Sequence, residues 1–146
     1  MRVDSILMIC TGNICRSPMA EVLLAHSLSS RREVKVASAG IAAPVGAPAD
    51  PLAQQLMQER NLNLSAHFAR QLELDLVRQF QLLLVMDNRQ RDWIQRRFPI
   101  AHGRVYLLGQ WRDLEIPDPY RRPLADFQRA LMLIEQSLED WLARLK

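Results

Sequence analysis

The sequence Cys10-Thr11-Gly12-Asn13-Ile14-Cys15-Arg16-Ser17-Pro18 follows directly on the apolar run Ile6-Leu7-Met8-Ile9. The apolar run is rich in β-forming residues and predicts a buried strand. Ser17 followed by Pro18 is typical of an N-cap and a first helical residue. We therefore expect Cys10 at the end of a strand, followed by a loop that leads into the N-terminus of a helix. Residues 10–17 are called the cradle loop below.

A loop in this position can curl so that several backbone N–H groups converge on one point and bind an anion. Gly12 allows a positive φ or a close backbone approach, and Asn13 tolerates the left-handed region while its side chain braces the loop. The loop lacks the Gly-Lys-Ser/Thr ending of a nucleotide-binding loop, so it does not indicate a nucleoside triphosphate. The sequence therefore predicts a cradle for a smaller anion.

Instead of that Gly-Lys-Ser/Thr ending, the loop carries a thiol and a guanidinium. A helix N-terminus and a nearby arginine both favour the thiolate form of Cys10. The planar fork of Arg16 matches two oxygens of a phosphate. The hydroxyl of Ser17 can donate a hydrogen bond to the thiolate and stabilise it as a leaving group. The loop thus fits a phosphoryl group, with Cys10 as nucleophile.

The second cysteine of the loop has a plainer expected role. Free cysteine is ordinarily a small buried hydrophobe, so we expect Cys15 to form a wall of the loop. Pairing of Cys15 with Cys10 under oxidation is the alternative.

The pattern Cys-x5-Arg-Ser resembles the phosphate-binding loop of protein tyrosine phosphatases. The full nine-residue stretch closely resembles the low-molecular-weight class of bacterial type. Further segments extend the resemblance over most of the chain, namely Ser38-Ala39-Gly40, residues 64–72, Met86-Asp87 and Asp118-Pro119-Tyr120.

The resemblance implies roles for residues of the site. Cys10, Arg16 and Asp118 would be catalytic, with Asp118 as general acid. Substrate would be bound by Thr11, Gly12, Asn13, Ile14, Cys15, Ser17 and Tyr120. Ser38 would brace Asn13, and His67 would lie near the cradle loop, although a half-exposed histidine in a connecting segment is an equal alternative.

Asp118 lies in the segment 109–123 between Pro117 and Pro119, which restrict its backbone. Asp-Pro is also a common start of a turn. In a parallel sheet, however, this loop leaves the same edge as the cradle loop. Arg121 stands where the family often has a second tyrosine and is followed by Arg122, and the two place positive charge where acidic flanks of a phosphopeptide can bind. The Pro-rich loop 41–51 lacks the aromatic residue that many family members carry there.

The remaining chain predicts alternating helices and strands. We expect helices over 18–29, 51–60 (capped by Asp50), 87–98 (capped by Asp87) and 124–144, and strands over 34–38, 81–86 and 105–108. The last helix has a stripe made of Phe127, Leu131, Ile134, Leu138, Trp141 and Leu145. The fold class is α/β, a three-layer sandwich with a four-stranded parallel sheet flanked by helices on both faces. The resemblance implies the strand order 2-1-3-4 and one phosphatase-like domain over residues 1–146.

Composition agrees with a soluble domain, because the chain has 146 residues, 49% of them hydrophobic and 24% charged. We expect no membrane insertion, no cleaved signal peptide, a cytoplasmic location and a monomer. Two cysteines make no disulfide framework, and the three histidines show no metal-ligand spacing, so no metal or cofactor is expected. The net charge of +3 comes from arginine clusters that we interpret as solvated faces rather than a nucleic-acid site.

These observations predict a protein-tyrosine-phosphatase that acts through a cysteinyl phosphate. The resemblance implies a phosphotyrosine protein as substrate, with a bacterial tyrosine autokinase of exopolysaccharide or capsule export as the partner by analogy. The alternatives are an arsenate reductase, which needs downstream cysteines, a phosphoarginine phosphatase, which would have Thr in place of Ile14, and a non-catalytic phosphate-binding module, which would lack the thiol or the acid.

Overall fold

Four parallel strands form one sheet in the computed structural model, which describes residues 2–31 and 33–145. They are β1 (Ser5–Cys10), β2 (Lys35–Gly40), β3 (Leu82–Val85) and β4 (Val105–Leu107). Their order is β2-β1-β3-β4, with β1 paired to both β2 and β3. The predicted parallel sheet and its strand order are confirmed.

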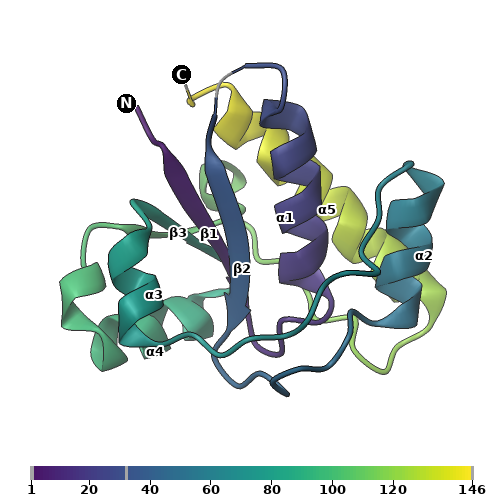
Figure 1. The fold of residues 1–146 in the computed structure, drawn as a ribbon, viewed down its shortest axis with the longest axis horizontal. Coiled ribbons are helices and arrows are strands. Elements are labelled where there is room, and N and C mark those ends of the chain that lie inside the picture. The colour runs from purple at the N-terminus through teal and green to yellow at the C-terminus, as the bar shows by residue number, and fades with distance from the viewer. Residues whose placement is uncertain (1, 32, 146) are drawn as a thin grey trace.

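Helices cover both faces of this sheet (Figure 1). They are α1 (Arg16–Leu28), α2 (Pro51–Glu59), α3 (Leu74–Gln79), α4 (Asn88–Arg97) and α5 (Leu124–Leu142), with short 3-10 turns at Pro99–Ala101 and Gln110–Arg112. Side chains of β1 alternate between the faces: Ile6 and Met8 pack with α1, α2 and α5, whereas Leu7 and Ile9 pack with α3 and α4. This alternation follows from the two-residue period of a strand, and it confirms the three-layer sandwich.

The apolar stripe of α5 packs on the core as predicted. All six of its side chains are buried, and Leu145 lies just beyond the end of the helix. Trp141 is fixed further because its indole Nε1 donates to Leu108 O at 2.8 Å. The stripe therefore binds the sheet and is not a surface for a partner.

Two predicted helix caps are present. The Asp50 carboxylate accepts a hydrogen bond from Leu52 N at the start of α2, and the Asp87 carboxylate accepts one from Gln90 N at the start of α4, each at 2.9 Å. Each satisfies a backbone donor that the helix itself leaves free.

The start of α1 was predicted wrongly. The helix begins at Arg16 with Cys15 in the cap position, so Ser17 is already helical and caps nothing. The hydroxyl of Ser17 is instead engaged by Cys10 and Asn13 inside the cradle loop. Pro18 is tolerated in the first turn because N–H groups there have no partner within the helix.

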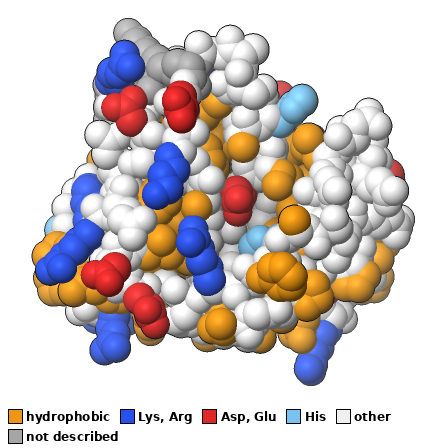
Figure 2. All heavy atoms as spheres, viewed as in Figure 1, with side chains coloured by type: hydrophobic (Ala, Val, Ile, Leu, Met, Phe, Trp, Pro, Cys, Tyr) orange, Lys and Arg blue, Asp and Glu red, His pale blue; other side chains and the backbone are white. Residues whose placement is uncertain are grey.

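The short helix α3 was not predicted, since a six-residue element leaves little periodicity in a sequence. The strand expected over 34–38 lies at Lys35–Gly40, so the Ser38-Ala39-Gly40 segment belongs to β2. Of the helices in the described ranges, none combines the length and the apolar run that a membrane crossing requires. Figure 2 shows Lys and Arg side chains interspersed with Asp and Glu on the face drawn in Figure 1.

Candidate active site

Cys10 is the last residue of β1, and its sulfur lies at the centre of the cradle loop. The side chain is buried, and two groups approach Sγ: Asn13 N donates to it at 3.2 Å, and Ser17 Oγ lies 2.9 Å away. The expected contact between Ser17 and Cys10 is therefore present.

Asn13 braces the loop with all of its amide atoms. Its Nδ2 donates to Ser17 Oγ and to Ser38 Oγ, each at 2.9 Å, and its Oδ1 accepts from Arg70 N at 2.9 Å. The residue is fully buried and has a φ of 57°, in the left-handed region. Ser38 thus lies where the resemblance placed it.

The left-handed turn of the loop falls on Asn13 and not on Gly12. A Cβ added at Gly12 would come no closer than 3.6 Å to another atom, so no protein atom requires a glycine there. Gly40 is the glycine that the packing requires, because a Cβ on it would lie 2.6 Å from Thr11 O and 3.0 Å from Asn13 N. The end of β2 therefore supports the loop from behind by close backbone contact.

His67 and Arg70 complete this support from the segment between α2 and α3. His67 Nε2 lies 2.7 Å from Asn13 O. A carbonyl oxygen only accepts, so Nε2 carries the proton and donates. Arg70 Nε donates to Ser38 O at 2.9 Å. His67 is therefore near the cradle loop, one of the two alternatives for this residue.

Arg16 is almost completely buried at the base of the site. Its Nη1 donates to Ile116 O at 2.8 Å and lies 3.6 Å from Asp87 Oδ2, while its Nη2 lies 3.8 Å from Asp118 Oδ2. Among the described residues, Nε has no hydrogen-bond partner. A buried donor without a partner is costly, so this atom is well placed to bind an oxygen of a ligand.

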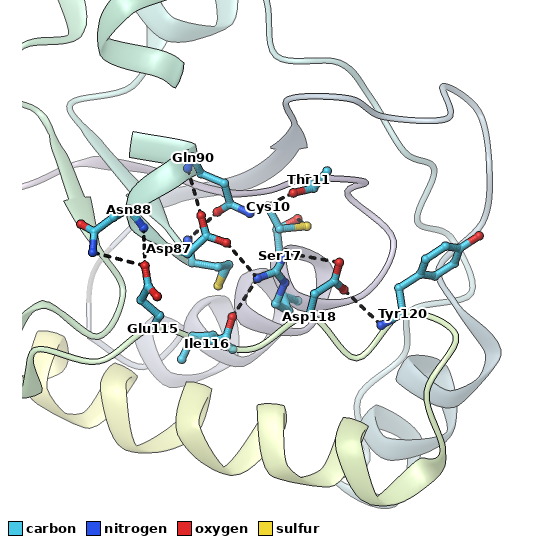
Figure 3. Close-up of polar contacts among 12 residues, drawn as sticks. Cys10, Thr11, Ser17, Asp87, Asn88, Gln90, Glu115, Ile116, Asp118 and Tyr120 are labelled. Carbon is cyan, nitrogen blue, oxygen red and sulfur yellow. Dashed lines mark hydrogen bonds and ion pairs between the residues drawn. The ribbon is translucent and has the colours of Figure 1, made fainter. Parts of the chain in front are cut away.

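Asp118 and Tyr120 form one wall of a pocket of about 210 Å³ that opens on the sulfur of Cys10. The Asp118 side chain is 52% exposed, and its Oδ1 accepts from Tyr120 N at 3.1 Å, which fixes the turn. Figure 3 shows Asp118 beside Tyr120, and its other oxygen, Oδ2, lies 3.8 Å from Arg16 Nη2. The pocket thus brings the two distant motifs together.

Ala42 and Pro44 belong to the loop after β2 and line the same pocket. These two residues belong to the loop 41–51, which has no aromatic side chain. The substrate slot is consequently bounded on this side by small groups. Thr11, Gly12, Ile14 and Cys15 also line the pocket, whereas Asn13 and Ser17 lie behind it.

Cys15 is a neutral thiol in this setting. Burial raises the pKa of the Cys15 thiol well above its usual range, and the carboxylate of Asp50 adds to the effect. Both cysteines are free. Cys15 therefore lines the pocket as an uncharged group, as expected for a wall residue.

Two residues of the site were missed at the sequence level. Asp87 was predicted only as a helix cap, yet its second oxygen faces Arg16. Gln90 is buried, and its amide accepts from Met86 N at 2.8 Å and donates to Thr11 Oγ1 at 3.1 Å (Figure 3). The position of Asp87 directly after a strand of the same sheet was a usable signal, but nothing in the sequence pointed to Gln90.

Within residues 2–31 and 33–145, no group of three or more His, Cys, Asp or Glu side chains is arranged to hold a metal ion. The donors around the pocket are instead N–H groups, a hydroxyl, a thiol and a guanidinium. This set suits an oxyanion.

Comparison with known proteins gives a consistent result. The model of the family described as low molecular weight phosphotyrosine protein phosphatase matches residues 5–146. The probable low molecular weight protein-tyrosine-phosphatase EpsP of Ralstonia nicotianae is 44% identical over 144 residues, which cover 99% of this chain and 97% of that protein.

Two solved structures show the same fold. The Erwinia amylovora tyrosine phosphatase AmsI superposes with a TM-score of 0.92 at 39% identity, covering 99% of this chain and 94% of that one. The tyrosine phosphatase Wzb from Escherichia coli K30, in complex with sulphate, has a TM-score of 0.91 at 41% identity, covering 97% and 98%.

Proposed function

The chain belongs to the low molecular weight phosphotyrosine protein phosphatase family, and from this premise we propose that it hydrolyses phosphotyrosine in proteins through a cysteinyl phosphate on Cys10. The observation that carries the proposal is the buried guanidinium of Arg16, which lines the same pocket as Cys10 and whose Nε lacks a hydrogen-bond partner among the described residues. A phosphoryl group in the pocket would supply the missing acceptor.

The first step transfers the phosphoryl group to the enzyme. Cys10 Sγ attacks phosphorus in line, so a sulfur–phosphorus bond forms while the bond from phosphorus to the phenolic oxygen breaks. Arg16 and the N–H groups of the cradle loop hold the equatorial oxygens as charge develops on them. Asp118 gives its proton to the departing phenolic oxygen.

The second step releases phosphate. Asp118, now a carboxylate, takes a proton from water as the water oxygen attacks phosphorus, and the sulfur–phosphorus bond breaks. The pair of electrons stays on Cys10 Sγ, where Ser17 Oγ at 2.9 Å and Asn13 N at 3.2 Å stabilise the thiolate. The enzyme returns to its starting state without a cofactor.

The alternatives fit this chain less well. An arsenate reductase of this fold passes a disulfide to downstream cysteines, and the sequence has no cysteine after Cys15. A phosphoarginine phosphatase would carry Thr at position 14, whereas Ile14 places a bulky apolar side chain on the pocket wall. A silent binding module would lack the thiol or the acid, and Cys10 and Asp118 line one pocket.

We further propose that the chain acts as one phosphatase domain, in the cytoplasm and as a monomer. By analogy with the family, its substrate is a phosphotyrosine protein such as a bacterial tyrosine autokinase of exopolysaccharide or capsule export.

The test compares phosphotyrosine and phosphoarginine peptides as substrates of the wild type and of Cys10→Ser. We expect turnover of phosphotyrosine by the wild type only, with Cys10→Ser still binding vanadate because Arg16 and the loop amides remain. Hydrolysis of phosphotyrosine by Cys10→Ser would rule out the covalent route, and faster turnover of phosphoarginine would change the substrate class.

A further inference from the structure

A second cleft adjoins the catalytic pocket and shares one residue with it. Its volume is about 290 Å³, and it lies between the turn around Asp118 and the first turns of α5. Its lining consists of Pro117, Asp118, Pro119, Arg122, Asp126 and Arg129. Because Asp118 also lines the pocket above Cys10, a peptide that places its phosphate in the pocket brings its neighbouring residues to the rim of this cleft.

The arginines of the cleft are not engaged by the protein itself. Arg122 and Arg129 are exposed, and neither forms an ion pair with any residue in the described part of the chain. Arg60 and Arg112, in contrast, are each paired with a carboxylate of α5. The charges of Arg122 and Arg129 are therefore available to a ligand.

The backbone holds these cations in a defined place. Arg122 N donates to Pro119 O at 2.9 Å, which closes a turn, and Arg121 within that turn has a φ of 63°. The guanidinium carbon of Arg121 lies 5.2 Å from the centroid of the Tyr120 ring, so a third cation sits on the aromatic wall of the pocket. A non-glycine residue in this conformation costs free energy, and the turn brings Arg121 against Tyr120, a residue of the pocket lining.

The carboxylates of the cleft only partly offset the positive charge of its arginines. Asp118 and Asp126 are the two acidic groups of its lining. Asp118 Oδ2 lies 3.8 Å from Arg16 Nη2, so its charge is partly balanced by that guanidinium. Arg122 and Arg129 therefore face one further carboxylate, that of Asp126, and an anionic group can bind beside them.

We propose that this cleft is a subsite for an anionic group on a residue next to the phosphotyrosine. The inference rests on the proposed function and names its substrate class, namely phosphotyrosine flanked by negative charge. A carboxylate of Asp or Glu and the phosphate of a second phosphotyrosine share this chemistry, and Arg129 and Arg122 can bind either.

The experiment measures kcat/KM for three peptides that differ only beside the phosphotyrosine: flanking Glu, flanking Gln, and a second phosphotyrosine. For the wild type, we expect the Glu peptide to exceed the Gln peptide by about three- to tenfold, because exposed charge pairs contribute modestly. The preference should shrink as salt is added, since these charges are screened. The arm with the second phosphotyrosine shows whether a phosphate is favoured over a carboxylate.

The variant Arg122→Gln/Arg129→Gln should bring the ratio of the Glu to the Gln peptide close to one. The matched control is Arg96→Gln/Arg97→Gln, which removes the same charge from the last turn of α4 and should keep the wild-type ratio. Arg121 is left intact because it contacts Tyr120. A wild-type ratio of one, or a ratio equally reduced in the control, would overturn the subsite.

Binding of the same peptides to Cys10→Ser separates the two proposals. If no peptide is hydrolysed by the wild type while Cys10→Ser binds the Glu peptide more tightly than the Gln peptide, the subsite stands and the proposed function fails. If all peptides are hydrolysed and bound alike, the proposed function stands and the subsite fails.

Discussion

Arg16 holds a positive charge almost without contact with solvent, and its neighbours explain how. Two carboxylates, Asp87 and Asp118, lie within 4 Å of its terminal nitrogens, and Ile116 O accepts one hydrogen bond. Burying a charge is costly unless it is paired and hydrogen-bonded, so these three groups keep the guanidinium in place. Among the described residues Nε has no hydrogen-bond partner, and Arg16 is part of the pocket lining.

Replacement of Arg16 by lysine tests whether activity needs the planar guanidinium or only its positive charge. Arg16→Lys keeps the charge but cannot bind two oxygens side by side or reach Ile116 O in the same geometry. We expect kcat/KM for phosphotyrosine to fall by about a hundredfold or more, as for the loss of an oxyanion-binding donor. Vanadate affinity should fall in parallel, and retention of most of the activity would show that charge alone suffices.

Asp118 is tested best by varying the leaving group. General acid catalysis is typically worth about 10²- to 10⁴-fold, and it matters most for a poor leaving group. Asp118→Asn should therefore slow hydrolysis of phosphotyrosine strongly and slow it much less for an aryl phosphate whose phenolate leaves without a proton. Equal losses on both substrates, with an unchanged pH profile, would mean that Asp118 only shapes the turn before Tyr120.

Strand β2 and helix α4 act as the elements that fix the cradle loop. Gly40 of β2 meets the backbone of Thr11 and Asn13, and Gln90 of α4 connects Met86 N to Thr11 Oγ1. The loop is thus held on one side by backbone contact and on the other by a buried amide. Both contacts depend on the parallel pairing that sets β2 and β3 beside β1.

Gly40→Ala should move the cradle loop. A Cβ at 2.6 Å from Thr11 O requires a backbone shift, so we expect kcat to fall by about tenfold or more, because small displacements in an active site are costly. The control is Gly103→Ala, at a residue with a φ of 83° and no atom near its added Cβ. That variant should lose about 1 kcal/mol of stability through strain and keep kcat. Wild-type kcat in Gly40→Ala would show that the contact relaxes freely.

At the scale of the whole molecule, the parallel sheet brings the ends of three strands to one edge. Cys10 ends β1, Asp87 follows β3, and Asp118 lies in the loop after β4. Ligands of parallel sheets bind at this edge. The three-layer sandwich therefore positions the proposed nucleophile, the residue that faces Arg16 and the proposed acid in one place.

The buried thiol of Cys15 links folding to pH. Burial raises its pKa in the folded state above the usual value of about 8.5, so the folded protein keeps a proton that the unfolded chain loses. Its contribution is therefore fully present below about pH 8.5 and declines by up to about 1.4 kcal/mol per pH unit above it. Urea unfolding between pH 8 and pH 10 should show a shallower decline for Cys15→Ala than for the wild type. Parallel curves would contradict the assignment.

Much of the site was predictable because two of its functional groups, the Cys10 thiol and the Arg16 guanidinium, lie in one short stretch of sequence. The cradle loop, its place after a buried strand, the apolar stripe of the last helix and the caps at Asp50 and Asp87 follow from local pattern, and the structure contains each of them. The start of α1 was misjudged because Ser17 has the sequence signature of a cap, while its hydroxyl is used by Cys10 and Asn13.

The resemblance had pointed to Ser38 and His67 as supports of the loop, but only the tertiary structure revealed the roles of Ile116, Gln90 and Gly40. The backbone carbonyl of Ile116 accepts a hydrogen bond from Arg16, which lies 100 positions away in the sequence. Any residue type can supply a carbonyl, so no sequence pattern indicates this contact. The residue types of Gln90 and Gly40 likewise do not indicate their roles. The roles arise because strand pairing places both residues against Thr11. The sequence by itself determined the reacting groups and the strand that carries them, whereas packing of the sheet and its helices determined which partners hold those groups in position.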